Sequence, residues 1–268
     1  MNICSISSGS SGNCVYVETD KSKILVDAGL SGKKIQDNLS KIGIKASDID
    51  LILVTHEHMD HVQGVGVLSR RFDIPIYANE GTWLGMKNKI GKIKAKNINI
   101  FKTNKAENIR DFDLIPFATF HDARDPVGFS IIDRNQKISI LTDTGKFSEN
   151  ILYAIKDSDA YYIEANHDEE MLRNGPYPLS LQERIRSTYG HLSNYESRDL
   201  LLEILRGNNE KVILGHLSEE NNREDLAAFT IDHELLSNGL DTTRDIELVV
   251  AKRYSPSKFF DIEKVRNE

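Results

Sequence analysis

The segment Thr55-His56-Glu57-His58-Met59-Asp60-His61 places three imidazoles and two carboxylates next to one another. Neutral imidazole and carboxylate are the usual protein ligands of zinc, manganese and iron. In extended or turning backbone, His56 and His58 lie on one side of the chain and Glu57 on the other. Asp60 and His61 can then point towards a second centre nearby. The chain holds only eight histidines, so three in one short segment indicate a metal site and not an ordinary solvated loop.

A zinc-protease helix is a competing interpretation, because the segment contains His56-Glu57. The protease motif H-E-x-x-H puts its second histidine four residues after the first, so that both lie on one face of a helix. That position is Asp60 in this chain. The protease interpretation therefore fails.

The metal-binding segment follows a short apolar run, Leu51-Ile52-Leu53-Val54, which is typical of a buried strand. We therefore expect it on a loop that leaves a strand, where a rigid scaffold can hold several ligands around one point. Further polar residues that also follow predicted strands are Asp27, His121, Asp143 and His216. Strand ends at one edge of a layered fold converge in space, so these side chains are expected to share one site.

The rest of the chain interleaves predicted strands and helices, with no linker, repeat or low-complexity tract. Apolar runs predict strands at residues 2–6, 14–18, 23–26, 51–54, 74–78, 114–120, 127–133, 137–141, 160–163, 211–214 and 246–251. Helical spacing and caps predict helices at residues 32–44, 62–72, 80–90, 148–156, 181–188, 193–205 and 223–236. We expect a single domain over residues 1–268, with two sheets packed together and helices outside.

Two segments between these elements have an unusual composition. Residues 7–13, Ser-Ser-Gly-Ser-Ser-Gly-Asn, lie between two predicted strands and are expected to form a hairpin loop. Their small side chains favour a tolerant turn over an anion-binding nest of backbone amides. Residues 91–104 are rich in lysine, with alternating isoleucines. This pattern is typical of a solvated strand edge, which can also touch a phosphate backbone.

The composition, 39% hydrophobic and 28% charged residues, is that of a globular protein with a substantial core. No run of about 18 apolar residues predicts a membrane span, and the first residues do not resemble a signal peptide. Cys4 and Cys14 lie in apolar surroundings, so we expect buried thiols without disulfides and a cytoplasmic protein. A net charge of −7 argues against coating nucleic acid, but it is compatible with a local basic groove or with metals that supply positive charge.

The pattern His56-x-His58-x-Asp60-His61, with Asp27 before it and His121, Asp143 and His216 after it, resembles the metallo-β-lactamase-fold hydrolases. The resemblance spans nearly the whole chain and implies an αββα fold that binds two divalent metal ions, Zn²⁺, Mn²⁺ or Fe²⁺. It implies that His56, His58 and His121 hold the first metal. Asp60, His61 and His216 would hold the second metal, and Asp143 would bridge both. Asp27 would orient a ligand imidazole from outside.

Finer features favour one branch of these hydrolases. The lactamase branch has a cysteine near the position of Asp143, whereas this chain has none after Cys14. Residues 144–215 leave no room for the large inserted β-CASP domain. The motifs at 7–14, His121-Asp122-Ala123 and Gly190-His191-Leu192-Ser193 resemble the YycJ (VicX, WalJ) family. That resemblance implies a cytoplasmic bacterial phosphodiesterase, a 5′-to-3′ exonuclease that acts on DNA through a metal-bridging hydroxide.

Two residues are expected to be catalytic, Asp60 among the ligands and His191 as the proton donor to the leaving oxygen. His191 precedes a predicted helix that Ser193 and Glu196 open as a capping box. Candidate substrate contacts are Ser10, Asn13, Asn166, His167 and Ser193. For Ser193 the capping role is the competing interpretation, and for His167 it is a structural histidine.

A small-molecule hydrolase of the same fold, acting on a cyclic phosphodiester or a thioester, remains an alternative. The net negative charge favours it, whereas Arg70, Arg71, Arg124 and the lysines of residues 92–105 favour DNA. A module that uses metal only structurally is disfavoured, because structural zinc sites are closed and rich in thiolate.

Overall fold

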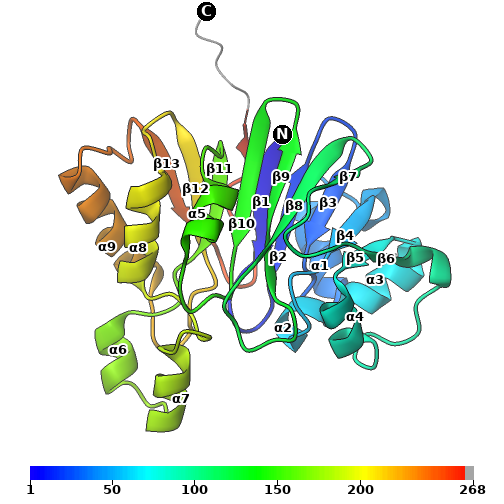
Figure 1. Cartoon of the computed structure of the whole chain (residues 1–268), viewed down its shortest axis with the longest axis horizontal. Coiled ribbons are helices and arrows are strands. Elements are labelled where there is room, and N and C mark those ends of the chain that lie inside the picture. Colours follow the sequence, from blue (N-terminus) through cyan, green and yellow to red (C-terminus); the bar gives the residue numbers. More distant parts are fainter. Residues whose placement is uncertain (263–268) are drawn as a thin grey trace, which may run out of the picture.

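Two β-sheets packed face to face form the centre of the protein in the computed structural model, which describes residues 1–262 (Figure 1). In the described residues the first sheet has the order β14-β1-β2-β3-β4-β5-β6 and the second β13-β12-β11-β10-β9-β8-β7. The strands of the first sheet are β1 (Asn2–Ser7), β2 (Cys14–Glu18), β3 (Lys23–Val26), β4 (Leu51–Leu53), β5 (Ile76–Ala78), β6 (Ile98–Ile100) and β14 (Phe260–Asp261). Those of the second are β7 (Glu107–Ile109), β8 (Phe112–Ala118), β9 (Val127–Asp133), β10 (Gln136–Leu141), β11 (Ala160–Glu164), β12 (Glu210–Gly215) and β13 (Ile246–Val250).

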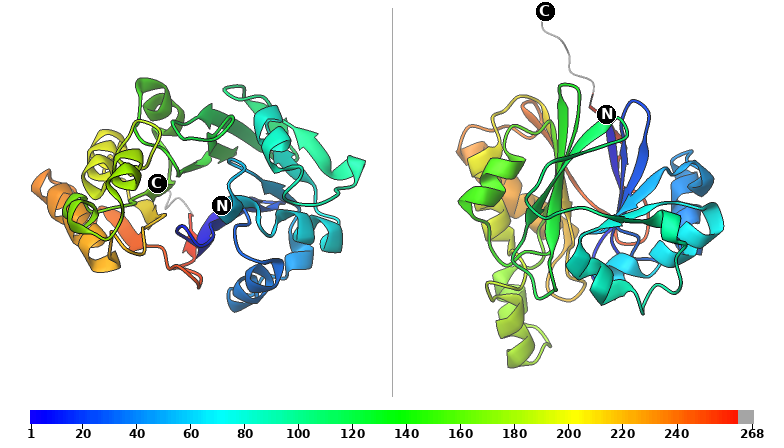
Figure 2. Two further views of the ribbon diagram at one scale, coloured as in Figure 1. Left: turned by 90° about the horizontal axis from the view of Figure 1, so that it is seen from below. Right: turned by 45° about the vertical axis from the view of Figure 1, so that its right-hand side comes forward.

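Helices cover the outer face of each sheet (Figure 2). The α-helices are α1 (Gly32–Lys41), α2 (Met59–Val62), α3 (Val65–Phe72), α4 (Glu80–Met86), α5 (Glu149–Ile155), α6 (Glu169–Asn174), α7 (Leu179–Ile185), α8 (Asn194–Ile204) and α9 (Glu224–Ser237). Short 3-10 helices are η1 (Ala46–Asp48) and η2 (Ala95–Asn97). Residues of α1, α3 and α4 pack on the first sheet, and residues of α5, α8 and α9 on the second.

The alternation along each strand explains the layers. In β2, Val15 and Val17 point into the core between the sheets, whereas Cys14 and Tyr16 pack against the helices outside. Successive side chains of a strand point to opposite faces, so a strand that is apolar on both faces needs a covering layer on each side. The predicted αββα fold, two packed sheets flanked by helices, is confirmed.

The predicted helix over residues 62–72 is wrong in one respect, because it is split into α2 and α3 around Gly64. The backbone N–H of Gly64 donates to the carbonyl of Ala28 at 2.7 Å. A Cβ at Gly64 would lie 2.5 Å from the carbonyl oxygen of Leu30. The chain therefore leaves the helical path here to contact the loop that follows Asp27.

Some elements give no sequence signal. β14 pairs with β1 from the opposite end of the chain, and β7 is a short edge strand beside β8. Helix α6 buries only Leu172, so it lacks an apolar stripe.

The lysine-rich segment forms η2 and the edge strand β6. Lys94 and Lys96 there form ion pairs with Asp73, which reduces the free positive charge at that edge.

Several strand-end predictions are confirmed by the sheet topology. β3 and β4 are parallel neighbours, as are β10, β11 and β12. The carboxyl ends of parallel strands meet at one edge of a sheet, and this brings the residues that follow these strands to the lower edge in Figure 1. Residues 8–13 connect the antiparallel pair β1 and β2 as the predicted hairpin loop.

Both cysteines, Cys4 and Cys14, are buried and free. Among the described residues, the helices are all too short or too polar to cross a membrane.

Candidate metal centre

Two groups of ligand-type side chains meet where the loops leave the strands. In each group, one nitrogen or oxygen from every residue lies within 4.8 Å of the others. The first group is His56, His58 and His121, and the second is Asp60, His61 and His216. They come from the loop after β4, from α2, and from the chain after β8 and β12. The structure thus brings together every residue that the sequence assigns to the two metals.

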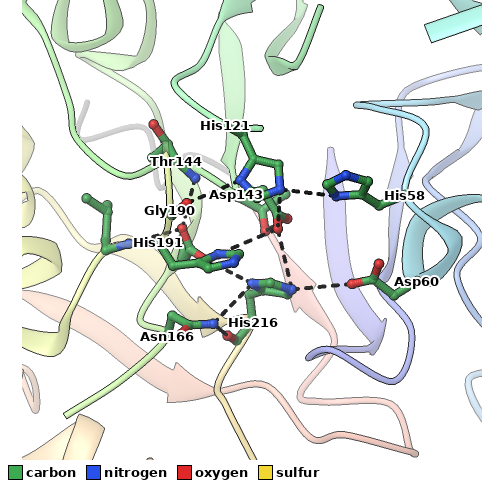
Figure 3. A network of polar contacts seen from close by, with 12 residues as sticks. His58, Asp60, His121, Asp143, Thr144, Asn166, Gly190, His191 and His216 are labelled. Carbon is green, nitrogen blue, oxygen red and sulfur yellow. Dashed lines mark hydrogen bonds and ion pairs between the residues drawn. The ribbon is translucent and has the colours of Figure 1, made fainter. Parts of the chain in front are cut away.

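Asp143 lies between the two groups (Figure 3). Its Oδ2 is 3.1 Å from Nε2 of His61. Its Oδ1 is 3.7 Å from Nε2 of His121 and 3.6 Å from Nε2 of His216. One buried carboxylate therefore contacts histidines of both groups.

Asp27 fixes the orientation of His61 from outside the cluster. Its Oδ2 accepts a hydrogen bond from Nδ1 of His61 at 2.8 Å, which leaves Nε2 to point inward. Thr55 donates its backbone N–H and its hydroxyl to the same carboxylate, at 2.9 and 2.8 Å. The Thr55 hydroxyl also lies 3.0 Å from Nδ1 of His56. A carboxylate behind a ligand imidazole sets its tautomer and raises its basicity.

His121 has a similar arrangement with a backbone partner. Its Nδ1 donates to the carbonyl of Gly190 at 3.2 Å, so Nε2 carries the lone pair. That Nε2 lies 3.2 Å from Nδ1 of His58. Two ring nitrogens that face each other in this way can be satisfied together by a cation between them.

Glu164, the last residue of β11, connects two further histidines. Its Oε1 accepts from Nδ1 of His191 at 2.7 Å and from Nδ1 of His216 at 2.8 Å. Its Oε2 accepts from the backbone N–H groups of Thr144 and Leu192, at 3.0 and 3.4 Å. The side chain is fully buried. Glu164 also forms a ligand-type group with Asp143, His191 and His216. Because both of its oxygens already accept from donors, its role in this structure is to orient the two histidines.

No role is predicted for Glu164 from the sequence alone, although a signal for it is present there. Glu164 ends a buried strand in the same way that Asp27 and Asp143 follow one. The strand-end argument therefore applied to it equally.

The donor set fits divalent cations. The Nε2 atoms of His56 and His216 are buried and have no hydrogen-bond partner among the described residues. Nε2 of His61 faces the Asp143 carboxylate while its Nδ1 is held by Asp27. Unpartnered imidazole lone pairs that converge with carboxylates form the ligand set of catalytic zinc, manganese or iron sites.

The electrostatics of the cluster agree with this fit. Burial by itself would raise the pKa of Asp143, but His216 and His61 outweigh it and hold that pKa well below its usual range. Burial also opposes ionisation of Glu164, yet His191 and His216 hold its pKa at about 2. Burial and the neighbouring His61 lower the pKa of His56 well below its usual value. Burial opposes protonation of His61 and His216, yet Asp143 outweighs it and raises the pKa of both, that of His216 to about 10. These two imidazoles therefore offset the carboxylate charge by holding protons, and bound cations would take the place of those protons.

The backbone is strained at three residues of the cluster. Asp27, Asp143 and His216 have φ values of 62°, 53° and 56°. Non-glycine residues rarely adopt this left-handed conformation, which costs about 1–3 kcal/mol each and is found mainly at functional sites. In each case the turn directs a side chain from the strand end into the cluster.

Asn13 lies against the second group and not at the surface. Its Nδ2 is 3.0 Å from Nε2 of His61 and 3.4 Å from Oδ2 of Asp60. The backbones also approach closely, since Asn13 N donates to Asp60 O at 2.7 Å and Gly29 N donates to Asn13 O at 2.8 Å. A Cβ at Gly29 would lie 1.6 Å from the carbonyl oxygen of Asp60, so only glycine allows this contact.

The other candidate substrate contacts divide into two pairs. Ser10 and Asn166 line a cavity beside the cluster. His167 and Ser193 are buried and do not line it. Ser193 forms the predicted capping box with Glu196 at the start of α8, and burial lowers the pKa of His167 to about 4. The structure therefore favours structural positions for this second pair.

The cavity opens onto the cluster at His121 and His191 and has a volume of about 170 Å³. The side chain of His191 is partly exposed, at 18%, and its Nδ1 is held by Glu164. The Nε2 atom of His191 is therefore available to a group bound in the cavity. Asp60, with 26% of its side chain exposed, is the more accessible carboxylate of the cluster, since Asp143 is exposed by only 3%.

Comparison with known proteins identifies the family. The metallo-beta-lactamase superfamily model matches residues 8–216. Exodeoxyribonuclease WalJ of Streptococcus pneumoniae (serotype 2, strain D39) is 43% identical over 245 residues, which cover 91% of each chain. Exodeoxyribonuclease YycJ of Bacillus anthracis is 38% identical over 253 residues, covering 94% of this chain and 96% of that protein.

Solved structures show the same fold at low sequence identity. The metallo-beta-lactamase fold protein YhfI of Bacillus subtilis superposes with a TM-score of 0.70 at 15% identity, covering 96% of this chain and 99% of that one. The short form of human tRNase Z gives a TM-score of 0.65 at 17% identity, covering 98% and 100%. The chain therefore belongs to the metallo-beta-lactamase superfamily and, within it, to the family of the exodeoxyribonucleases WalJ and YycJ.

Proposed function

We propose that the protein is a metal-dependent phosphodiesterase that acts on DNA as a 5′-to-3′ exonuclease. The observation that carries this proposal is the cluster of histidines and carboxylates around Asp143, in a chain 43% identical to a relative named exodeoxyribonuclease. A ligand set of imidazole and carboxylate without thiolate suits hydrolysis at phosphorus by two cations.

The proposed ligand sets are His56, His58 and His121 for one cation and Asp60, His61 and His216 for the other, with Asp143 shared. Zn²⁺, Mn²⁺ and Fe²⁺ all suit these ligands. Bound there, two divalent cations act as Lewis acids that offset phosphate charge and allow water to act as a nucleophile near neutral pH.

The protein's own groups would orient and transfer protons. Asp27 and Glu164 hold the inward-facing nitrogens of His61 and His216 in position. Asp60, the more exposed carboxylate, would orient the attacking water. His191, with Nδ1 fixed by Glu164, would present Nε2 as the proton donor to the leaving oxygen.

The direct test is turnover of 5′-end-labelled double- and single-stranded DNA by the metal-loaded protein, beside bis(p-nitrophenyl) phosphate. We expect release of the label as mononucleotide and its loss in His58→Ala. Hydrolysis of the small diester with intact DNA would support the small-molecule phosphodiesterase instead, an alternative that the net charge of −7 favours.

The dependence of the rate on salt separates the same two functions. A polymer substrate held by several phosphate contacts loses affinity steadily as salt rises, because its counterions are released on binding. We expect kcat/KM on DNA to fall with salt while that on bis(p-nitrophenyl) phosphate changes little. A flat response on DNA would contradict a polymer substrate.

A further inference from the structure

The cavity beside the metal centre is lined in part by α7 and by the turns on either side of it. Helices α6 and α7 project beyond the edge of both sheets (Figure 1). Leu181, Arg184 and Ile185 of α7 line the same cavity as His121 and His191. A group bound in the cavity therefore lies next to the position where the scissile phosphate would be held.

The two sides of the cavity differ in chemistry. The outer side is apolar and aromatic, formed by Tyr177, Leu181, Ile185 and Tyr189. Leu181 and Ile185 are four residues apart on α7, so they lie on one face of the helix. The other side is polar, formed by Ser10, Asn166 and Ser218. A lining that combines aromatic side chains with hydrogen-bonding groups suits a flat ring with polar edges.

The charges at the cavity compensate one another. Arg184 lines it, and its guanidinium binds the Asp122 carboxylate, with Nε 2.7 Å and Nη2 2.5 Å from Oδ2. Asp122 also lines the cavity. Because the cation is already paired, the cavity has little attraction for a phosphate and is better suited to a neutral group.

The size of the cavity sets a further limit. At about 170 Å³ it is smaller than the roughly 300–1,000 Å³ of pockets that enclose drug-sized ligands. It therefore accepts one small ring system and not a stretch of strand.

The loop that carries Tyr189 is fixed relative to the catalytic groups. His191 N donates to Ile185 O at 2.9 Å, and Gly190 O accepts from Nδ1 of His121. The pair formed by Arg184 and Asp122 joins α7 to the residue next to His121. The aromatic wall and the metal centre are thus held at a set separation.

We propose that this cavity binds the nucleobase of the terminal nucleotide, stacked on Tyr189, while the adjacent phosphodiester lies at the metal centre. This inference rests on the proposed exonuclease function. Stacking on an aromatic side chain tolerates any base, because every base has a π-face. The binding of the terminal base places the first linkage at the metal centre, as the proposed exonuclease requires.

The test compares two DNA substrates that differ only at the terminal nucleotide, one with a normal base and one with an abasic tetrahydrofuran residue. The wild-type holoenzyme should remove the normal nucleotide with a kcat/KM higher by on the order of tenfold. In Tyr189→Ala this ratio should fall towards one, and in Tyr189→Phe, which keeps the ring, it should persist. Tyr189 is 58% exposed, so its truncation leaves the core intact.

Tyr153→Ala is the matched control, because Tyr153 is also an exposed tyrosine, at 73%, and lies on α5 outside this cavity. This variant should keep the wild-type ratio of kcat/KM between the normal and the abasic substrate. If the wild type removed the normal and the abasic terminal residue at equal rates, the proposal of a base-binding cavity would be wrong, but the exonuclease function would stand. If the wild type did not cleave DNA at all, the proposed function itself would be wrong.

A binding measurement gives an independent readout. A 5′-terminal 2-aminopurine should lose fluorescence on stacking within the first milliseconds after mixing with the holoenzyme, before turnover. The loss should be absent in Tyr189→Ala and present in Tyr153→Ala. Equal quenching in both variants would contradict stacking on Tyr189.

Discussion

His191 and His216 share one hydrogen-bond acceptor, because Nδ1 of each donates to Oε1 of Glu164, at 2.7 and 2.8 Å. One buried carboxylate thereby orients a proposed metal ligand and the proposed proton donor together. A change at Glu164 should therefore affect metal binding and turnover at the same time, whereas a change at His191 should affect mainly turnover.

The substitution Glu164→Gln tests this shared role. The glutamate pKa is held at about 2 by the two histidines, so the substitution removes a charge that is present at neutral pH. We expect turnover and metal affinity each to fall by about 10- to 100-fold, as for other partners behind ligand imidazoles. Both are measured on the reconstituted protein, by kinetics and by competition with a chelator.

Glu210→Gln is the control for that substitution. Glu210 is also a buried carboxylate that accepts from backbone N–H groups, those of Arg206 and Asn208. It lies at the start of β12, remote from the cluster. Equal effects of the two substitutions on metal affinity would show that Glu164 acts only through stability.

His191→Ala should reduce turnover more than it reduces metal content. Loss of a positioned proton donor costs about 10²- to 10⁴-fold in rate. The reduction should be smaller on bis(p-nitrophenyl) phosphate than on DNA, since an acidic phenol leaves without a proton. Parallel loss of bound metal and of turnover would instead make His191 a ligand.

Ser8→Ala should destabilise the turn that carries His216. The Ser8 hydroxyl accepts from His216 N at 2.6 Å and is 2.8 Å from the hydroxyl of Tyr162. Its removal leaves buried groups without partners, which costs about 1–3 kcal/mol. Urea unfolding measures the loss. Ser11 lies in the same loop, and its hydroxyl makes an exposed hydrogen bond with the hydroxyl of Tyr254. Ser11→Ala should therefore leave the free energy of unfolding nearly unchanged. A loss of stability similar to that of Ser8→Ala would contradict this account.

The two cysteines should be unreactive in the native protein. Burial raises the pKa of Cys4 to about 11 and that of Cys14 well above its usual value. Thiolate forms only as the pH approaches the pKa, so at pH 8 only about one Cys4 in a thousand is reactive. A chromogenic disulfide reagent should titrate the two thiols after unfolding in denaturant. Rapid stoichiometric reaction without denaturant would be inconsistent with their burial.

The sequence predicts the cluster because its ligands follow strands that are recognisable from apolar runs. His56, His121 and Asp143 are examples. β4 runs parallel to β3 and β10 parallel to β11, and β8, which leads to His121, points the same way as β10 because each is antiparallel to β9. Glu164 also ends a strand, but its partners, like those of Asn13, are distant in the sequence. The roles of both residues depend on which side chains lie opposite them in space, His61 for Asn13 and His216 for Glu164, and no local pattern encodes those partners.

The helices and turns around the cavity are equally hard to predict from the sequence. Helix α6 has one buried side chain, Leu172, and so it gives no periodic signal. The residues of the aromatic wall, Tyr177 and Tyr189, lie in turns on either side of α7. The pairing of Arg184 with Asp122 across the fold, together with the hydrogen bond from His191 N to Ile185 O, makes that wall part of the site.

The most direct test of the dinuclear centre is the number of metal ions per chain, measured by elemental analysis after reconstitution with Zn²⁺ or Mn²⁺ and removal of excess metal. We expect two ions in the wild type, and fewer than two in His58→Ala and Asp143→Ala, with DNA hydrolysis abolished in both while their far-ultraviolet circular dichroism is unchanged. Full metal content and full turnover in either variant would contradict the assignment of these residues as ligands.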